Sequence, residues 1–190
     1  MSLDLFISTI GKERIKRNEK LTYYTFSKSS GAAEALYVAT TQRELINALD
    51  LCRELNLPYF IIGSGTKVLL SSEVKGVVIK NRTSGLKVAG VKGKISREGL
   101  GVEEAYVEAE SGVSLNKLND FLKIQKLRSV DGFSSLHSTV GGSIFLDPVL
   151  RDKVQSLLVW DDGEVEEIKL LDLKRKQVVL SVIFKFKSAQ

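Results

Sequence analysis

The chain has 190 residues, of which 43% are hydrophobic and 27% charged, enough for one sizeable core or for two small subdomains that share one. No apolar run approaches the ~20 residues that a membrane-spanning helix needs. The N-terminus has no signal-peptide core, because Asp4 interrupts its apolar residues, and we expect a cytoplasmic protein. A lone Cys52 and a lone His137 exclude an internal disulfide and a zinc site of the usual ligands, so no metal is expected.

The net charge of +5 is unevenly distributed along the chain. Residues 75–97 carry seven basic residues and no acidic one, whereas acidic residues cluster at 103–110 and 161–167. A basic stretch can attract nucleic acid or an anionic cofactor. This one lacks interleaved aromatic residues that stack on bases. A solvated pair of strands with lysines on the outer face is therefore the simpler interpretation, and we expect no nucleic-acid partner.

Periodicity predicts alternating helices and strands over the first 80 residues. In chain order these are a helix at 3–10, a charged segment at 11–20, a strand at 35–40, a helix at 42–55, and strands at 59–62 and 76–80. This alternation indicates a small α/β unit in which the helix at 42–55 covers a sheet.

The helix at 42–55 has the clearest signals. Thr41 and Glu44 have the spacing of a capping box. One apolar face is formed by Leu45, Ala48, Leu49, Cys52 and Leu55. Cys52 is therefore predicted to be a small core residue and not a nucleophile.

Beyond residue 80 the pattern changes to antiparallel strands with one longer helix. The predicted elements are strands at 85–93 and 103–112, a helix at 114–127 capped by Ser114, a hairpin of strands at 154–160 and 164–171, and a closing strand at 178–187.

A glycine-rich loop, "GSGTKVLL" (63–70), follows the predicted strand at 59–62. It is not a P-loop, because Thr66 separates Gly65 from Lys67, and it is not a dinucleotide fingerprint, because Val68 stands where a third glycine would open a helix. A loop of successive backbone N–H groups at a strand end remains, which can bind an anion. A second run, "SSLHSTVGGSIF" (134–145), carries Gly141-Gly142, and the two runs together could hold a long pyrophosphate ligand from both sides.

The order of these segments resembles the UDP-N-acetylenolpyruvoylglucosamine reductase (UDP-N-acetylmuramate dehydrogenase) family, flavoenzymes of peptidoglycan precursor synthesis. The resemblance is carried by "NEKLTYYTFSKSSGAAE" (18–34), residues 41–80, "VEAESGVSLNKLNDFL" (107–122), "STVGGSI" (138–144) and "VVLSVIFKFK" (178–187). It implies an α+β, two-lobed FAD-binding fold of the vanillyl-alcohol-oxidase or PCMH type, without the family's substrate domain. The expected lobes are a small α/β lobe, residues 1–80, and an antiparallel-sheet lobe with helices, residues 81–190.

The resemblance also implies FAD as the cofactor, with NADPH as a possible electron donor. The FAD pyrophosphate would be bound through the backbone amides of Gly63, Ser64, Gly65, Thr66, Lys67, Val68 and Leu69. The path from adenine to flavin would be lined by Gly112, Val113, Ser138, Thr139, Val140, Gly141, Gly142 and Ile144.

The chain departs from the family pattern at several positions. Lys67 replaces the usual Asn, Leu136-His137-Ser138 replaces Ile-Pro-Gly, and residues 147–152 replace an Asn-Ala-Gly-Ala-Tyr-Gly segment. The family's Tyr-Arg segment and late acidic residue have no counterpart, so the catalytic residues are left unassigned. His137 could transfer a proton, but a loop histidine that fills space is the simpler interpretation, and Ser181 is interpreted as a structural strand residue.

Two functions remain open at this point. The first is an FAD-binding flavoprotein domain without the substrate domain, which could pass electrons, work with a protein partner that supplies the substrate contacts, or retain only binding. The second is a structural or interaction module of the same fold that no longer binds flavin. A reductase acting alone is not expected, because neither the proton donor nor the carboxylate clamp is found.

Overall fold

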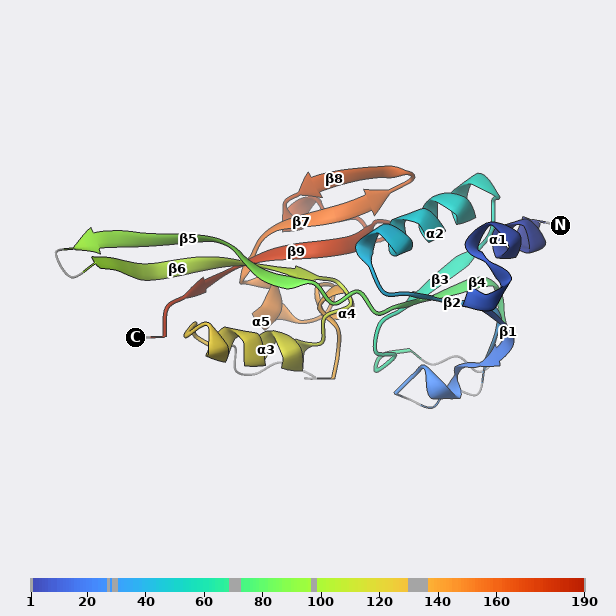
Figure 1. Ribbon diagram of the computed structural model, residues 1–190, viewed down its shortest axis with the longest axis horizontal. Helices are drawn as coiled ribbons and strands as arrows, with labels where there is room; N and C mark the ends of the chain where they lie inside the picture. Colours follow the sequence, from blue (N-terminus) through green and yellow to red (C-terminus); the bar gives the residue numbers. More distant parts are fainter. Residues whose placement is uncertain are drawn as a thin grey trace. The chain divides into compact units, whose positions relative to one another are not determined.

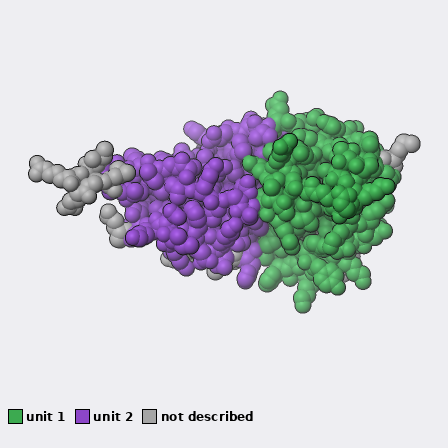
Figure 2. Space-filling model, in the orientation of Figure 1, with its two compact units in different colours: residues 1–83, 162–164 green, residues 84–161, 165–190 purple. Residues whose placement is uncertain are grey.

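The computed structural model describes residues 2–26, 28, 31–68, 73–96, 99–129 and 137–189 (Figure 1). The chain divides into two units, shown in green and purple in Figure 2. Unit 1 comprises residues 1–83 and 162–164, and unit 2 comprises residues 84–161 and 165–190. In the described part of the chain, no helix is both long and apolar enough to span a bilayer.

Unit 1 is built on a four-stranded sheet with the strand order β1-β2-β4-β3. Strands β2 and β3 run parallel to β4, and β1 is antiparallel to β2. The predicted alternation of helix and strand is confirmed. The elements are α1 (Ser2–Ile10), η1 (Lys12–Arg14), β1 (Ile15–Lys20), η2 (Leu21–Tyr23), β2 (Ala32–Ala39), α2 (Gln42–Glu54), β3 (Tyr59–Ile62) and β4 (Val74–Asn81).

Helix α2 begins with the predicted capping box. The Thr41 hydroxyl accepts a hydrogen bond from Glu44 N at 3.2 Å, and the Glu44 carboxylate accepts from Thr41 N at 3.3 Å. Thr40 N also donates to this carboxylate at 2.8 Å, and this bond is the main reason why the pKa of Glu44 falls to about 2. Cys52 is fully buried, as predicted, and burial raises the pKa of its thiol to about 12.

Unit 2 is built on a five-stranded sheet with the strand order β5-β6-β9-β7-β8, in which β6 and β7 flank β9 and pair with it antiparallel. Its strands are β5 (Leu86–Ser96), β6 (Gly99–Glu110), β7 (Val154–Asp161), β8 (Glu164–Ile168) and β9 (Val178–Lys187). Its helices are α3 (Leu115–Ile124), α4 (Val140–Ser143), α5 (Pro148–Arg151) and η3 (Leu170–Asp172). With this antiparallel sheet and the mixed sheet of unit 1, the predicted α+β fold is confirmed.

One hydrophobic cluster joins the helices of unit 2 to one face of its sheet (Figure 1). Leu118 and Leu122 of α3 belong to the same cluster as Val107 of β6 and Phe184 of β9, and all four are fully buried. Ser114 caps α3 as predicted, because its hydroxyl accepts a hydrogen bond from Lys117 N. Helix α3 is therefore held on the β6–β9 pair by packing and by a cap.

Three residues of the basic stretch, Lys87, Lys92 and Lys94, lie on β5, next to the acidic residues of β6. Lys87 forms an ion pair with Glu108 at 3.0 Å, and Lys94 forms one with Glu103 at 3.0 Å. Lys87 and Glu108 are directly opposite each other in the antiparallel pair β5–β6, whereas Lys94 is opposite Gly101 and reaches Glu103 diagonally. The pairing supports a solvated ribbon whose charges compensate each other.

Candidate functional site

The glycine turn of unit 1, residues 63–66, directly follows β3. Because β2, β3 and β4 are mutually parallel, their carboxyl ends lie at one edge of the sheet, which is where ligands bind in open α/β sheets. Ile62 ends β3 and is fully buried, whereas Lys67 beyond the turn is exposed. Val68 is partly buried against a cluster that includes Leu21. Leu69, the last residue of the predicted pyrophosphate loop, lies outside the described residues.

The turn is seated on the segment that follows η2. Gly65 has a φ of +72°, and a Cβ at this position would lie 2.5 Å from Thr25 Cα and 3.0 Å from Tyr24 O. Its carbonyl oxygen accepts a hydrogen bond from Phe26 N at 3.2 Å. Only glycine combines this positive φ with so close an approach of two backbones. The predicted need for glycine therefore has a physical reason at Gly65.

A buried lysine lies at the end of the neighbouring strand. Lys80 of β4 is 7% exposed, and its strand partners are Val38 of β2 and Ile62 of β3. Its Nζ donates hydrogen bonds to Tyr24 O at 2.8 Å and to Gly63 O. The ammonium group thus links the carbonyl oxygen of Gly63, the first residue of the glycine turn, to that of Tyr24 in the segment that follows η2.

Burial changes the acidity of this lysine. Desolvation, together with the nearby positive charge of Arg82, lowers the pKa of Lys80 from 10.5 to about 8. The acceptors recorded for its Nζ are neutral carbonyl oxygens, and no carboxylate among the described residues forms an ion pair with it. The turn therefore rests on a positive charge that has no counter-ion in the described part of the chain.

These contacts determine which backbone groups the glycine turn can offer. The carbonyl oxygens of Gly63 and Gly65 both accept hydrogen bonds from within unit 1. The hydroxyls of Ser64 and Thr66 lie 3.3 Å apart. A turn whose carbonyls are tied inward can direct N–H and O–H groups outward, which is the arrangement that binds an anion.

The second predicted segment lies in unit 2, where the structure brings together residues far apart in sequence. Val140 N donates to Val113 O at 2.8 Å, and Leu115 N donates to Ser138 O at 2.9 Å. A β-bridge joins Ser114 to Thr139. The predicted residues Gly112 and Val113 therefore lie beside the predicted residues Ser138 to Gly142, and Val140 and Ile144 are fully buried.

The amide groups of this second turn are used within the unit. Gly141 N donates to Ser111 O at 2.8 Å, Gly142 N donates to the Thr139 hydroxyl at 3.4 Å, and Ser143 N donates to Thr139 O at 2.9 Å. The two glycines differ in their surroundings. A Cβ on Gly141 would lie 2.8 Å from Ser111 Cβ, whereas a Cβ on Gly142 would meet only Thr139 Oγ1, at 3.4 Å. Packing therefore requires glycine at position 141 and not at 142.

Two residues singled out in the sequence have roles within the fold. Asp147 is 1% exposed and caps α5, because its carboxylate accepts hydrogen bonds from Val149 N at 3.1 Å and Leu150 N at 3.2 Å. Ser181 is 2% exposed on β9, between Leu158 of β7 and Glu110 of β6. His137 is exposed, and Leu136 lies outside the described residues.

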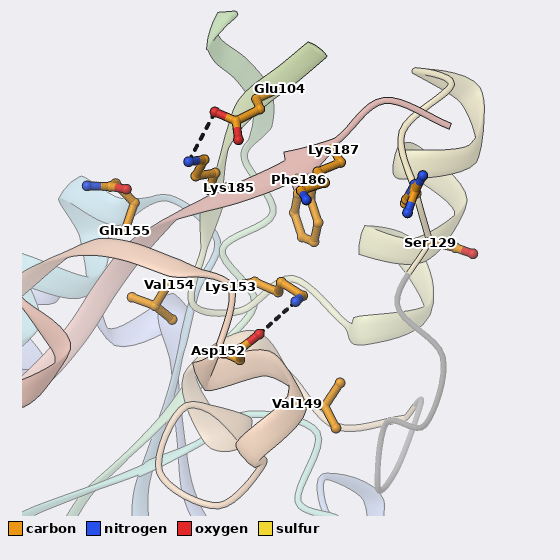
Figure 3. Close-up of a pocket in the computed structure, with 11 residues that line it drawn as sticks. Glu104, Ser129, Val149, Asp152, Lys153, Val154, Gln155, Lys185, Phe186 and Lys187 are labelled. Carbon is orange, nitrogen blue, oxygen red and sulfur yellow. Dashed lines mark hydrogen bonds and ion pairs between the residues drawn. The ribbon is translucent and has the colours of Figure 1, made fainter. Parts of the chain in front are cut away.

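Unit 2 also contains a pocket of about 720 Å³ at the end of the β6–β9 pair where Glu104 lies opposite Lys187 (Figure 3). Its charged side chains include the ion pairs Lys185–Glu104 at 3.0 Å and Lys153–Asp152 at 2.7 Å. Its other lining residues are Arg128, Ser129, Val149, Val154, Gln155, Phe186 and Lys187. With four basic and two acidic side chains in the lining, the pocket suits an anion better than a cation.

Among the described residues, no group of three His, Cys, Asp or Glu side chains could hold a metal ion.

Lys80 was not predicted as a site residue. The available signal was a lysine at the end of "GVVIK" (76–80), a strand that is otherwise apolar after its glycine. A lysine in a buried parallel strand needs a polar partner. That partner, the Gly63 carbonyl, is 17 residues away in sequence.

Known proteins match most of the chain. Residues 33–145 match the family described as "FAD binding domain". The chain is 30% identical over 174 residues to UDP-N-acetylenolpyruvoylglucosamine reductase of Petrotoga mobilis, covering 84% of this chain and 52% of that protein. It spans about half the length of the relatives it matches. The resemblance identified in the sequence is confirmed.

Solved structures share the fold. UDP-N-acetylenolpyruvylglucosamine reductase from Thermus caldophilus superposes with a TM-score of 0.70 at 20% identity, over 93% of this chain and 64% of that one. p-Cresol methylhydroxylase with bound substrate superposes with a TM-score of 0.65 at 14% identity, over 98% of this chain and 43% of that one. At these identities the likeness concerns the fold alone.

Proposed function

Because the chain belongs to the FAD binding domain family, we propose that it binds FAD at its glycine turn and forms the cofactor-binding part of a reductase. The reaction that we propose is the one for which the relatives are named: the reduction of an enolpyruvyl group on UDP-N-acetylglucosamine. This reaction belongs to peptidoglycan precursor synthesis. Units 1 and 2 would be lobes of one FAD-binding domain, as expected for residues 1–80 and 81–190.

The observation that carries this proposal is the arrangement of the glycine turn. The carbonyl oxygens of Gly63 and Gly65 accept hydrogen bonds from Lys80 Nζ and Phe26 N, respectively. Gly65 has a positive φ, and a Cβ at this position would collide with Thr25. Residues Gly63 to Leu69 would hold the diphosphate. The rest of the cofactor would be lined by Gly112, Val113, Ser138 to Gly142 and Ile144. These residues would contact it by packing and not by their amide groups, because the amides of Val140, Gly141 and Gly142 already donate within unit 2.

Bound FAD would supply hydride transfer, which amino-acid side chains cannot perform. The residues of this chain would bind and orient the cofactor. We assign no proton donor and no carboxylate clamp to this chain, and we propose that a partner or a further segment provides them. NADPH is proposed as the electron donor.

The test is a visible absorption spectrum of the purified chain, followed by titration with FAD and thermal unfolding. We expect flavin absorption bands or, for protein purified without cofactor, binding that raises the Tm. A ligand at 100 times its Kd stabilises the native state by about 2.7 kcal/mol. A colourless protein whose Tm does not change with excess FAD would contradict the proposal.

A second candidate function is an interaction module of the same fold without flavin. It is favoured by two exposed apolar side chains next to α4, Phe145 at 39% and Leu146 at 60% exposure. Exposed apolar patches can mark protein-binding surfaces. The same FAD titration separates the two functions, because a module without flavin would show neither bands nor a shift.

A further inference from the structure

We propose that Lys80 is the positioning residue of the diphosphate-binding turn, and that its buried positive charge makes diphosphate affinity depend on pH. This inference rests on the proposed function, because it concerns the same turn. It assigns to a strand residue a role that neither the glycine motif nor the comparisons with known proteins indicate.

The positioning role follows from the two carbonyls that Lys80 binds. Its Nζ bridges Gly63 O in the turn and Tyr24 O in the segment beneath it. A peptide group has its N–H and C=O on opposite sides, so a carbonyl held inward turns the following N–H outward. Without the lysine, the Gly63 carbonyl would lose this donor and could rotate toward the ligand.

The electrostatic role follows from the surroundings of the ammonium group. Arg82, directly after the same strand, and Lys67, in the glycine loop, add positive charge to this edge. In the segment beneath, the Tyr24 hydroxyl is occupied by Lys16 and Glu19. On β2, the Glu34 carboxylate accepts a hydrogen bond from Gly76 N at the other end of β4. The Tyr37 ring, also on β2, lies beneath the Arg14 guanidinium, which is hydrogen-bonded to Glu44. β3 contributes Ile62 beside Lys80 and, at its start, Tyr59.

The protonation of Lys80 sets the sign of the pH dependence of affinity. Burial and Arg82 lower the pKa of Lys80 to about 8, so above pH 8 the unliganded protein loses this charge. A bound diphosphate adds negative charge near the ammonium group and raises its pKa. Affinity is therefore highest below pH 8 and falls as pH rises. Because the complex keeps a proton that the free protein releases, affinity should be roughly tenfold weaker at pH 9.5 than at pH 7.5.

Stability without ligand has the opposite slope. A lysine whose pKa is lowered by folding binds fewer protons in the native state than in the unfolded state between about pH 8 and 10.5. The unliganded protein therefore gains stability over this window as pH rises. A buried lysine with no role in binding would show the slope in stability without the slope in affinity.

The experiment measures FAD and ADP affinity of the full chain between pH 7.5 and 9.5. The wild type should lose about tenfold in affinity for both ligands over this range. Lys80→Arg keeps its charge at every pH tested and should show a flat profile. Lys80→Met should bind weakly throughout. The matched control is Lys75→Met, an exposed lysine on the same strand, which should retain the wild-type profile.

A second measurement uses the wild type alone, so that it does not depend on the folding of any variant. NMR titration of Lys80 Nζ should give a higher pKa in the ADP complex than in the free protein. Wild-type binding that is independent of pH, with an unchanged Lys80 pKa, would overturn this inference alone. A wild type that binds neither FAD nor ADP at any pH would overturn the proposed function and this inference with it.

Discussion

The two glycine-containing turns use opposite sides of their peptide groups. In unit 1, the carbonyls of Gly63 and Gly65 are bound by Lys80 and Phe26 N. In unit 2, the N–H groups of Gly141 and Gly142 are bound by Ser111 O and Thr139. The first turn can therefore offer donors to an anion, whereas the second has its donors occupied.

This difference shows that glycine content alone does not define a phosphate-binding turn. Glycine allows two backbones to approach closely, and both turns use it for that purpose, Gly65 against Thr25 and Gly141 against Ser111. The direction of the peptide groups decides which ligand charge a turn accepts.

The largest effect is expected for Gly65→Ala. The new Cβ would lie 2.5 Å from Thr25 Cα in a conformation with φ of +72°, so the turn must move. We expect a loss of about 1–3 kcal/mol in the free energy of unfolding. FAD affinity should fall at least about tenfold, or about 1.4 kcal/mol. Urea denaturation and FAD titration measure the two effects.

The matched control for this change is Gly11→Ala. Gly11 is another glycine of unit 1 with positive φ, +106°, and its substitution would meet the Glu13 side chain. It should lower stability without changing FAD affinity. Equal losses of affinity in the two variants would mean that strain in unit 1, and not the turn, controls binding.

The next effect separates the two glycines of unit 2. Gly141→Ala places a Cβ 2.8 Å from Ser111 Cβ and should cost about 1–3 kcal/mol of stability through overpacking. Gly142→Ala meets no such contact and should change stability by less than about 0.5 kcal/mol. If this turn lines the cofactor, Gly142→Ala should weaken FAD binding in a fully stable protein. Unchanged FAD affinity would remove Gly142 from the proposed site.

A smaller effect is expected at the cap of α2, which serves as a reference away from both turns. Thr41→Ala should cost about 1 kcal/mol. Glu44→Gln should lower stability at neutral pH, because the pKa of Glu44 is lowered to about 2 by folding. The stabilisation by this carboxylate is present above about pH 4.5 and is lost as pH falls toward 2. Denaturation of both variants across pH measures these losses of stability, and FAD titration should show unchanged affinity. A loss of FAD affinity would contradict the view that the cap of α2 is independent of the binding site.

The smallest effect is expected for the reactivity of Cys52. Its thiol is fully buried and burial raises its pKa to about 12, so a thiol reagent should not label the native protein. Gly65→Ala should leave Cys52 protected, because Cys52 lies on α2 and the turn rests on the η2 segment. Rapid labelling of this variant would show that unit 1 unfolds, and that its loss of FAD affinity is not local.

Much of the fold could be predicted because its signals are local. Thr41 and Glu44 are three residues apart, and their capping box forms as predicted. The strands at 59–62 and 178–187 agree with β3 and β9 at both ends. Strand β1 was not predicted, because of its residues only Ile15 is buried and its charged side chains read as a solvated segment. A charged edge strand of this kind acquires its structure from pairing with β2.

The candidate site was predictable only in part. The positions of the small-residue runs are local, but the orientation of their peptide groups depends on distant residues. Lys80 is 17 residues from Gly63 and 56 from Tyr24, and Ser111 is 30 residues from Gly141. Asp147, which marks a departure from the family pattern, caps helix α5. This role was not predicted, because α5 has only four residues and was not predicted as a helix.

The most direct test of the difference between the turns is a ¹H–¹⁵N NMR titration of the isotope-labelled chain with ADP, which carries the diphosphate without the flavin. We expect saturable shifts of the amide signals of Ser64 to Lys67, with those of Val140 to Ser143 nearly unchanged. Shifts concentrated on Val140 to Ser143, with residues 64–67 unaffected, would contradict the assignment of the diphosphate to the glycine turn of unit 1.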